Sequence, residues 1–307
     1  MRVLITGISG FVGRYIADQL QVEGAEVCGI CRNSQNVRNK FRAFVGDLAD
    51  QEFLNNLVKE IKPTHVFHAA GVLGGVRNTV QYKVNVIGTV NLLDALLLLE
   101  TKPLVFILSS SAVYGFAPDM PIYEDTNYNP ISHYGVSKVA QELVSHQYQL
   151  DYDMQIVRIR TFNLIGPRQS RSMVSSELAY QVACAEMGGP RVLRVGNLAP
   201  RRDYTDVRDA VEAYVLLAKL AKPGNVFNVC SGQSYAVQDV VDLLMEMSTV
   251  PLKIKVEPQR KRSVEISDQI GSFKRLNEDT QWQPKISFKR SVADLLDDWR
   301  NHLQKIK

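Results

Sequence analysis

The chain has 307 residues, of which 45% are hydrophobic and 22% are charged. This composition excludes a mainly disordered protein and provides enough apolar side chains for a substantial core. The richest apolar run, Ala95–Leu99, lies between Asp94 and Glu100 and is far shorter than the roughly 18 residues of a membrane span. The N-terminus carries no signal-peptide pattern. We therefore expect a cytoplasmic protein with no membrane partner.

The net charge of +4 is unevenly distributed along the chain. From Pro251 onward there are 13 Lys/Arg and 8 Asp/Glu residues, so this segment carries +5. A basic tail would suggest nucleic acid, whereas a basic folded lobe would suggest a small anion. Apolar periodicity favours a folded lobe and no nucleic-acid partner, and it runs through Phe288, Val292, Leu295, Leu296 and Trp299. An ordinary solvated basic face is the alternative interpretation.

The cysteines and histidines do not indicate a metal site. Cys28 and Cys31 form a C-x-x-C, but the surrounding residues are typical of a strand and no second pair follows. His65 and His68 lie in another predicted strand, and no H-x-x-x-H or acidic cluster accompanies them. We expect buried, reduced cysteines and no bound metal.

The first half of the chain alternates short apolar runs with amphipathic stretches. The predicted strands are Arg2–Thr6, Ala25–Cys31, Arg42–Gly46, His65–His68, Leu104–Ser109 and Met154–Arg160. The predicted helices are Phe11–Val22, Gln51–Ile61, Arg77–Glu100 and Ser132–Tyr152. This alternation predicts an α/β fold, with a Rossmann-type doubly wound parallel sheet covered by helices on both faces.

After residue 160 the alternation becomes irregular. The predicted helices here are Ser175–Met187, Val207–Leu220, Val237–Met247 and Ser291–Gln304, and the predicted strands are Val226–Cys230 and Leu252–Val256. We assign residues 1–160 to a nucleotide-binding Rossmann domain. Residues 161–307 are expected to form mainly a smaller C-terminal α/β substrate lobe, with some segments returning to the sheet.

A glycine-rich segment follows the first strand and opens the first helix. Gly7, Gly10 and Gly13 occupy a G-x-x-G-x-x-G spacing, with Phe11 and Val12 inside it. Glycines let the backbone approach a pyrophosphate, and a helix N-terminus offers free N–H groups and positive potential. The strand–turn–helix context therefore predicts a dinucleotide site.

A second motif, Y-x-x-x-K, lies within a predicted helix. Tyr134 and Lys138 are four residues apart, which places them one turn apart on the same face. A nearby ammonium stabilises a phenolate and makes the tyrosine a better proton shuttle. His133 adjoins Tyr134, but neighbours on a helix point about 100° apart, so a direct role for it is the weaker alternative.

The glycine spacing together with Y-x-x-x-K resembles the extended branch of the short-chain dehydrogenase/reductase superfamily. In that superfamily a Ser or Thr five residues before the glycine of a V-Y-G motif binds the reacting oxygen. Counting back from Gly115 gives Ser110. The resemblance thus implies a catalytic set of Ser110, Tyr134 and Lys138, with Tyr134 and Lys138 also contacting cofactor.

The resemblance also implies which cofactor binds. NAD-binding members carry an acidic residue after the second strand, where this chain has Arg32, 19 residues beyond Gly13. A guanidinium suits the 2′-phosphate of NADP(H), so NADP(H) is expected to be preferred and NAD(H) is the alternative. An exposed arginine without a ligand is the other interpretation. Further segments resemble adenine and ribose contacts, namely Asp47, Leu48, Ala69, Ala70 and Gly71.

Segments in the second half resemble the GDP-mannose dehydratase and GDP-4-keto-6-deoxymannose reductase branch of this superfamily. The implied diphosphate contacts are Asn163, Arg202 and Arg262, and Glu265 is expected at a ribose or guanine group. Val174 lies where the branch contacts guanine, and Ser111 joins Ser110 as a substrate contact. Arginines suit a diphosphate because their planar fork donates two parallel hydrogen bonds. Ordinary surface ion pairs are the alternative for each arginine.

The resemblance implies an enzyme that reduces the 4-keto group of a nucleotide-linked 4-keto-6-deoxyhexose, with GDP-4-keto-6-deoxymannose giving GDP-rhamnose as the preferred case. Dehydratases of the superfamily carry a glutamate where this chain has Ala112, so dehydration is not expected. A nucleotide-sugar 4-epimerase with bound NAD is one alternative, and a non-catalytic NADP-sensing protein is another.

We also expect a homodimer through the Arg77–Glu100 and Ser132–Tyr152 helices. The leucines between residues 92 and 99 exceed what one core-facing stripe requires. They are Leu92, Leu93, Leu96, Leu97, Leu98 and Leu99.

Overall fold

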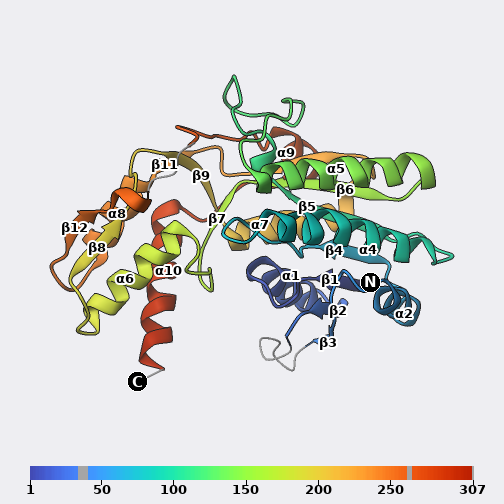
Figure 1. Ribbon diagram of the computed structural model, residues 1–307, viewed down its shortest axis with the longest axis horizontal. Coiled ribbons are helices and arrows are strands. Elements are labelled where there is room, and N and C mark those ends of the chain that lie inside the picture. The colour runs from blue at the N-terminus through green and yellow to red at the C-terminus, as the bar shows by residue number, and fades with distance from the viewer. Residues whose placement is uncertain (34–40, 261–264, 306–307) are drawn as a thin grey trace.

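A seven-stranded parallel sheet forms the largest layer of the protein (Figure 1). The computed structural model describes residues 1–33, 41–260 and 265–305. The strands lie in the order β10-β6-β5-β4-β1-β2-β3, and the pairings between them are parallel. They are β1 (Arg2–Thr6), β2 (Glu26–Cys31), β3 (Arg42–Val45), β4 (His65–His68), β5 (Leu104–Ser110), β6 (Ile156–Thr161) and β10 (Val226–Val229). This order is a Rossmann arrangement, as predicted. Successive strands are added toward one edge from β1 to β3 and toward the other edge from β4 onward, so the strand order reverses between β1 and β4.

Helices cover both faces of this sheet, as its doubly apolar strands require. Leu4 and Ile5 are neighbours in β1 but belong to opposite cores. The Ile5 core includes α1 (Phe11–Val22) and α7 (Val207–Leu220). The Leu4 core includes α2 (Gln51–Ile61), α4 (Gly88–Leu97) and α5 (His133–Tyr152). The predicted doubly wound layer is confirmed.

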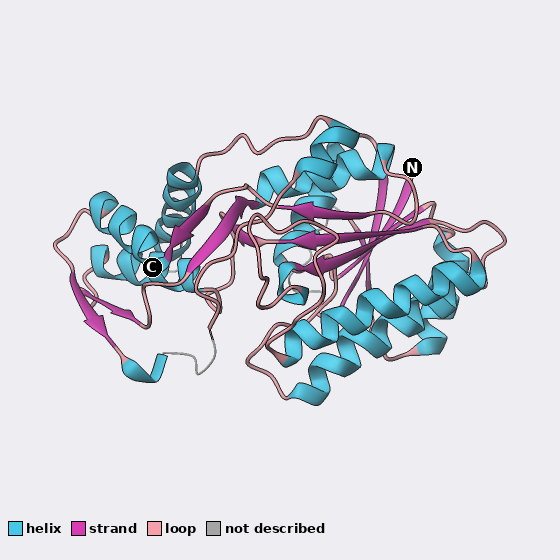
Figure 2. Cartoon of the chain, turned by 90° about the horizontal axis from the view of Figure 1, so that it is seen from above, coloured by secondary structure: helices cyan, strands magenta, loops and turns pink. Residues whose placement is uncertain are grey.

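A smaller group of helices and short strands lies to one side of the sheet (Figure 1 and Figure 2). It has its own apolar core, which α6 (Val174–Glu186), α8 (Val237–Met247) and α10 (Phe288–Gln304) help to form. A two-stranded ribbon pairs β8 (Val192–Val195) with β12 (Lys253–Val256). A three-stranded sheet contains β7 (Asn163–Ile165), β9 (Arg201–Asp206) and β11 (Ser234–Ala236). Residues after 161 thus build this group and also supply β10 and α7 to the main layer.

The predicted Arg77–Glu100 helix is wrong in detail, because a π-helical turn interrupts it. The observed elements are α3 (Asn78–Tyr82), the π turn η2 (Lys83–Ile87) and α4, which ends at Leu97. Asn85 lies in the widened turn and exchanges two hydrogen bonds with the backbone of Val72, at 2.9 and 3.1 Å. Its amide also donates to Ser137 Oγ at 2.9 Å. The turn thereby ties the residues after β4 to α5, in keeping with the frequent use of π turns at functional sites.

Several short elements were not predicted from the sequence. β9 contains two arginines and two aspartates among its six residues, a composition that intrinsic strand propensity disfavours. Its pairings with β7 and β11 are tertiary and invisible to local patterns. α10 begins at Phe288, three residues before the prediction, because Ser287 caps it by accepting from Arg290 N. The remaining short helices are η3 (Ser111–Val113), η4 (Pro258–Arg260) and α9 (Lys274–Thr280).

The described part of the basic C-terminal segment is folded, and several of its cations are in ion pairs with acidic residues. Lys285 pairs with Glu212, Lys289 with Glu246 at 2.7 Å and Arg300 with Glu186 at 2.6 Å. These contacts favour the solvated-face interpretation over a dedicated anion-binding surface for this part of the segment. Among the described residues, no helix is both long and apolar enough to cross a membrane.

Candidate active site

A cavity of about 630 Å³ opens at the carboxyl ends of the central strands. Its lining comes from the glycine-rich turn after β1, the end of β5, the start of α5 and the segment 265–269. Parallel strands of a doubly wound sheet place ligand sites at this edge, where the strand order reverses. The structure thus brings both predicted motifs together in one cavity.

The glycine-rich turn has the close packing that a dinucleotide site requires. Gly7 has a φ of +71°, and a Cβ there would lie 2.9 Å from Ala70 Cα. A Cβ on Gly13 would lie 2.2 Å from Gly7 O. α1 begins after Gly10 without a side-chain cap, so its N-terminal N–H groups are left for an anion. Gly7, Gly10, Phe11, Val12 and Gly13 all line the cavity, and the turn fits a pyrophosphate.

The other predicted cofactor residues divide into two groups. Ala69 and Gly71 line the cavity, whereas the remaining four do not. Ala70 N donates to Thr6 Oγ1, and Leu48 is buried. The other two, Arg32 and Asp47, are exposed beyond the ends of β2 and β3. Arg32 precedes residues 34–40, which lie outside the described part of the chain.

The three predicted catalytic side chains line the same cavity. Ser110 ends β5, and its Oγ accepts from Ala112 N at 3.2 Å. Burial raises the pKa of Tyr134, and a hydrogen bond with the Ser110 hydroxyl partly offsets that rise. A raised pKa keeps the Tyr134 hydroxyl protonated at neutral pH, which is the state of a proton donor. Ser110 and Tyr134 can therefore bind one oxygen atom together.

Lys138 lies one turn after Tyr134 on α5. Its Nζ donates to Leu108 O and to Gln141 Oε1, both at 2.9 Å. Burial lowers the pKa of Lys138 to about 8, so this side chain is protonated in most molecules at pH 7. His133 is exposed, bonds Tyr82 Oη at 3.1 Å and does not line the cavity, so the placement does not favour a direct role for it.

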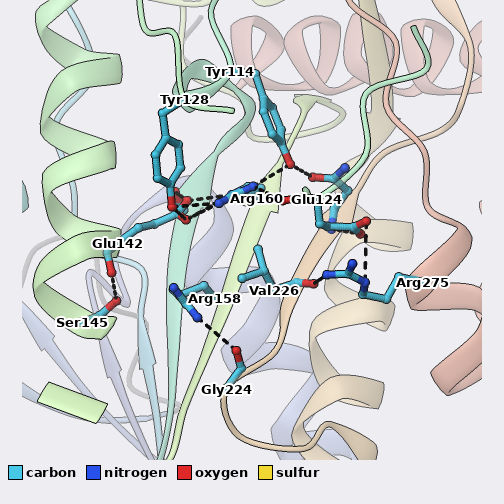
Figure 3. Close-up of polar contacts among 12 residues, drawn as sticks. Tyr114, Glu124, Tyr128, Glu142, Ser145, Arg158, Arg160, Gly224, Val226 and Arg275 are labelled. Atoms are coloured by element: carbon cyan, nitrogen blue, oxygen red, sulfur yellow. Dashed lines mark hydrogen bonds and ion pairs between the residues drawn. The ribbon is translucent and has the colours of Figure 1, made fainter. Parts of the chain in front are cut away.

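A buried ion pair joins α5 and β6 (Figure 3), next to the end of β5 that carries the predicted catalytic serine. Arg160 Nη2 lies 2.8 Å from Glu142 Oε2, and its Nη1 donates to Tyr114 Oη and to Glu124 O. Ser109 Oγ donates to Glu142 Oε1 at 2.5 Å. This network joins β5, α5 and β6 through Ser109, the residue before Ser110.

The same network anchors the proline-containing loop 116–131. Glu124 is buried, and its Oε1 accepts from Asn228 N at 2.8 Å. Ile122 forms a bridge with Gly271, and Ile131 lines the cavity. The loop borders the cavity and is fixed to β10.

Sequence reasoning missed Gln269, a buried residue of the cavity wall. Its amide exchanges two hydrogen bonds of 3.2 Å with the side chain and carbonyl of Ser111. Its own carbonyl accepts from Asp203 N in β9. Gln269 therefore joins the catalytic strand end to the smaller lobe across 158 positions of sequence. A local motif cannot reveal such a contact.

A second cavity of about 400 Å³ continues from the first into the smaller lobe. Asn163, Arg202 and Glu265 line both cavities, which makes them one continuous site. Val174 lines the second cavity, as do Arg171 and Arg194, which the sequence did not single out. Four predicted substrate residues, Asn163, Val174, Arg202 and Glu265, thus line the second cavity. Ser110 and Ser111 line the first cavity. The predicted Arg262 lies outside the described residues.

Arg202 has a structural contact in addition to its place in the site. Its Nη1 donates to Ile266 O at 2.8 Å, which holds the segment that carries Glu265. Glu265 Oε2 in turn accepts from Asn197 Nδ2 at 2.8 Å. In the described part of the chain, no cluster of three or more His, Cys, Asp or Glu side chains could hold a metal ion.

Known proteins with related sequences and structures share this architecture. A family model described as GDP-mannose 4,6-dehydratase matches residues 4–295. The GDP-6-deoxy-D-mannose reductase of Pseudomonas aeruginosa is 32% identical over 99% of this chain and 98% of its own length. The UDP-glucose 4-epimerase of Mycolicibacterium smegmatis is 30% identical over 99% of this chain and all of its own.

The solved structure of RMD from Pseudomonas aeruginosa complexed with NADPH aligns with a TM-score of 0.86. It is 30% identical and covers 98% of this chain and 99% of its own. The nearly complete coverage extends over both the sheet and the smaller lobe, and thus over the whole of the two-part site. The chain therefore belongs to the GDP-mannose 4,6-dehydratase family of extended short-chain dehydrogenases/reductases.

Proposed function

We propose that the protein is an NADPH-dependent reductase of a nucleotide-linked 4-keto-6-deoxyhexose, with GDP-4-keto-6-deoxymannose as substrate and GDP-rhamnose as product. One observation carries the proposal: Ser110 and Tyr134 line one cavity with the glycine turn, and this cavity continues to Arg202 and Glu265. The likeness to a GDP-6-deoxy-D-mannose reductase over both whole chains supports the same reaction.

NADP(H) is the preferred cofactor, and when bound it supplies the hydride. The glycine turn and the start of α1 would hold its pyrophosphate. Ser110 donates a hydrogen bond to the substrate carbonyl and polarises it, and Tyr134 gives its proton to the same oxygen as charge develops there. The Lys138 ammonium stabilises the tyrosinate that remains.

The diphosphate of the substrate would lie where the two cavities meet. Asn163 and Arg202 offer amide and guanidinium donors there, and Arg262 is proposed to contact the second phosphate. Glu265 would accept from the ribose or guanine, and Val174 would contact the base. Arg171 and Arg194 also line this end of the site, where each is already paired with a carboxylate, Glu177 and Glu257 respectively.

The test is NADPH oxidation measured with GDP-, dTDP- and CDP-linked 4-keto-6-deoxyhexoses. We expect the fastest turnover with the GDP sugar. A parallel incubation with GDP-mannose and catalytic NADP should give no 4-keto-6-deoxy product, because Ala112 has no group to move a proton at C5 or C6. Formation of that product would show a dehydratase, and no oxidation with any ketosugar would overturn the proposal.

An epimerase is the second candidate, because one relative of equal coverage is a UDP-glucose 4-epimerase. Such an enzyme returns the hydride and retains its cofactor. Purified protein carrying stoichiometric NAD would favour it over the reductase. A non-catalytic sensor is disfavoured, because it would not need Ser110, Tyr134 and Lys138 together.

Arg32 provides a test of cofactor choice. Arg32→Asp should weaken NADPH binding at least about tenfold more than NADH binding, because a carboxylate would face the 2′-phosphate. Steady-state kinetics with both cofactors would measure the ratio. The control is Lys59→Asp, the same charge change on an exposed residue of α2. An unchanged NADPH/NADH ratio in Arg32→Asp would contradict the assignment.

Arg202 provides a test of the substrate end. Arg202→Ala should raise the KM for the nucleotide sugar by about 10- to 100-fold, the effect of losing a charge-assisted hydrogen bond. Arg201→Ala is a matched control, because Arg201 adjoins it on β9 but lines neither cavity. Equal KM values in the two folded variants would make Arg202 an ordinary structural arginine.

We also propose a homodimer through α3, α4 and α5, but the reason given by the leucine count is wrong. Leu92, Leu93 and Leu96 are buried in the core, and Leu97 and Leu99 pack against it; only Leu98 of the six is exposed, at 48%. These leucines build the fold and do not require a partner.

A different apolar stripe supports the dimer. Val136, Leu143 and Leu150 on α5 are exposed and seven residues apart, and Val80 of α3 and Ile87 of the π turn η2 are exposed on the segment packed against α5. A heptad stripe on α5, with exposed apolar side chains beside it, fits the same surface of a second copy. Light scattering should give a dimer mass, and Leu143→Lys should lower it toward the monomer. A monomer mass for the native chain at all concentrations would refute the proposal.

The cytoplasmic location also stays a proposal. Burial raises the pKa of the Cys28, Cys31 and Cys230 thiols, and protonated, buried thiols are chemically inert. Such cysteines suit a reducing compartment.

A further inference from the structure

Gln141 is a fully buried polar residue on α5 that contacts the predicted catalytic lysine. It lies three residues after Lys138, and its Oε1 accepts from Lys138 Nζ at 2.9 Å. The other described acceptor of this ammonium is Leu108 O. Lys138 also lines the cavity, so these two oxygens hold the ammonium from the protein side.

The orientation of the Gln141 amide is fixed by a chain of buried hydrogen bonds. Its Nε2 donates to Thr89 Oγ1 at 2.8 Å, while the Thr89 hydroxyl donates to Asn85 O at 2.8 Å. A reversed amide would set its N–H groups against the Lys138 ammonium, donor against donor. The oxygen of Gln141 must therefore face Lys138.

The same reasoning determines which ring nitrogen of His68 carries the proton, because His68 continues this series of hydrogen bonds. Because the Thr89 proton is used, Thr89 Oγ1 accepts from His68 Nε2–H at 2.9 Å. His68 Nδ1 then accepts from the Thr6 hydroxyl at 2.7 Å, and Thr6 Oγ1 accepts from Ala70 N. Each of these hydrogen bonds thus has a single donor and a single acceptor. The whole set is satisfied when the His68 imidazole is neutral. Burial lowers the pKa of His68 to about 3, in agreement with that state.

The charged and titratable groups around Lys138 leave its ammonium without a carboxylate in contact. Glu142 follows Gln141 on α5, but its oxygens are bound by Arg160, Ser109 and Tyr128. The groups on the elements packed against this part of α5 are Tyr134 and Glu142 of α5, His68 of β4, Tyr82 of α3, Lys83 of η2, Asp94 of α4, and Arg158 and Arg160 of β6. Asp94 accepts from Tyr148 at the far end of the helix pair. Two neutral oxygens thus hold this buried cation.

We propose that Gln141 is a positioning residue, whose side-chain oxygen keeps the Lys138 ammonium protonated and directed at the active-site cavity. Losing the oxygen removes a hydrogen bond that is stronger to the charged form of Lys138 than to the neutral amine, so the neutral amine becomes relatively more favourable. Supplying a carboxylate in its place has the opposite effect. The two substitutions therefore predict shifts of opposite sign.

The test compares Gln141→Met and Gln141→Glu, which keep the side-chain length. The pKa of Lys138 is read in the cofactor-free protein by NMR of ¹³Cε-labelled lysine, with the signal assigned from Lys138→Met. Gln141→Met should lower this pKa by about one pH unit and Gln141→Glu should raise it by about one, the size expected for a hydrogen bond to a charged group. Ser145→Ala, a buried hydroxyl one turn further along α5, should leave it unchanged.

The kinetic consequence rests on the proposed reductase function. The alkaline limb of kcat against pH should move down in Gln141→Met and up in Gln141→Glu. If the native enzyme did not reduce a ketosugar, the proposed function would be wrong. The NMR test of the Lys138 pKa would still decide the role of Gln141. Equal Lys138 pKa values in both variants, or shifts of the same sign, would overturn the positioning role.

Thr89 provides an independent check that does not alter Gln141. Thr89→Val removes the hydroxyl that orients the amide and should lower the Lys138 pKa by a smaller amount. Thr89→Ser restores a hydroxyl and should restore the native value. A purely structural role for Thr89 would give no recovery of the pKa in Thr89→Ser relative to Thr89→Val.

Discussion

Replacing Tyr134 by phenylalanine is expected to lower kcat at least about 10²-fold, the scale for losing a positioned proton donor. The ring remains, so cofactor affinity should change little. The lost group is the hydroxyl of a residue that lines the cavity together with Ser110. Single-turnover oxidation of NADPH with saturating ketosugar would measure the loss on the chemical step alone.

A matched control for this substitution is Tyr82→Phe. Tyr82 lies near the start of α5 and bonds His133, but it does not line the cavity, so its turnover should stay near native. The pH dependence provides a second check. Because reduction consumes a proton from Tyr134, native kcat should fall as pH rises through the pKa of the Tyr134–Lys138 pair, and Tyr134→Phe should lack that tyrosine-dependent decline. Near-native turnover in Tyr134→Phe would mean that another group supplies the proton.

The parts of the site that sequence could predict are those in which chemistry follows from short spacing. Gly7, Gly10 and Gly13 form one turn, and Tyr134 and Lys138 lie one turn apart on one helix. Local geometry fixes these relations wherever the chain folds. The doubly wound parallel sheet also follows, because alternating apolar strands and amphipathic helices favour such a layer.

The parts that could not be predicted depend on contacts between distant segments. Gln269 reaches Ser111 across the interface of the two lobes, and its surroundings in sequence carry no sign of that contact. Gln141 shows the same difficulty on a helix that was predicted correctly. Its helical position was known, but its function depends on Thr89 and Lys138 facing it in the folded core.

The leucine count between residues 92 and 99 failed for a related reason. Periodicity on one helix cannot say how many neighbours cover it, and α4 is covered by α2, α5 and the sheet. The apolar side chains of α5 that do face outward, Val136, Leu143 and Leu150, are seven residues apart. Spacing relative to the neighbouring helix, and not the number of leucines, therefore carries the information about a partner.

The largest expected loss of stability comes from the ion pair behind the catalytic strand. Glu142→Gln should lower the free energy of unfolding by about 3–5 kcal/mol, because it leaves the Arg160 guanidinium buried without a countercharge. The side chains of Arg160 and Glu142 are 5% and 0% exposed, so water cannot replace the missing partner. Urea denaturation followed by circular dichroism would measure the change.

Two further variants separate charge burial from the loss of any one hydrogen bond. Glu246→Gln breaks an ion pair with Lys289 in which both side chains are 61% exposed, and it should cost at most about 1 kcal/mol. The double variant Glu142→Gln/Arg160→Met removes the stranded cation and should be more stable than Glu142→Gln alone, since an apolar side chain of similar length costs less to bury than an unpaired charge. If Glu142→Gln were no more damaging than Glu246→Gln, the network behind Ser110 would not be what holds β5, α5 and β6 together. With the expected order, the support of the catalytic serine is electrostatic as well as apolar, and it depends on a pair of residues 18 positions apart in sequence that only the fold brings into contact.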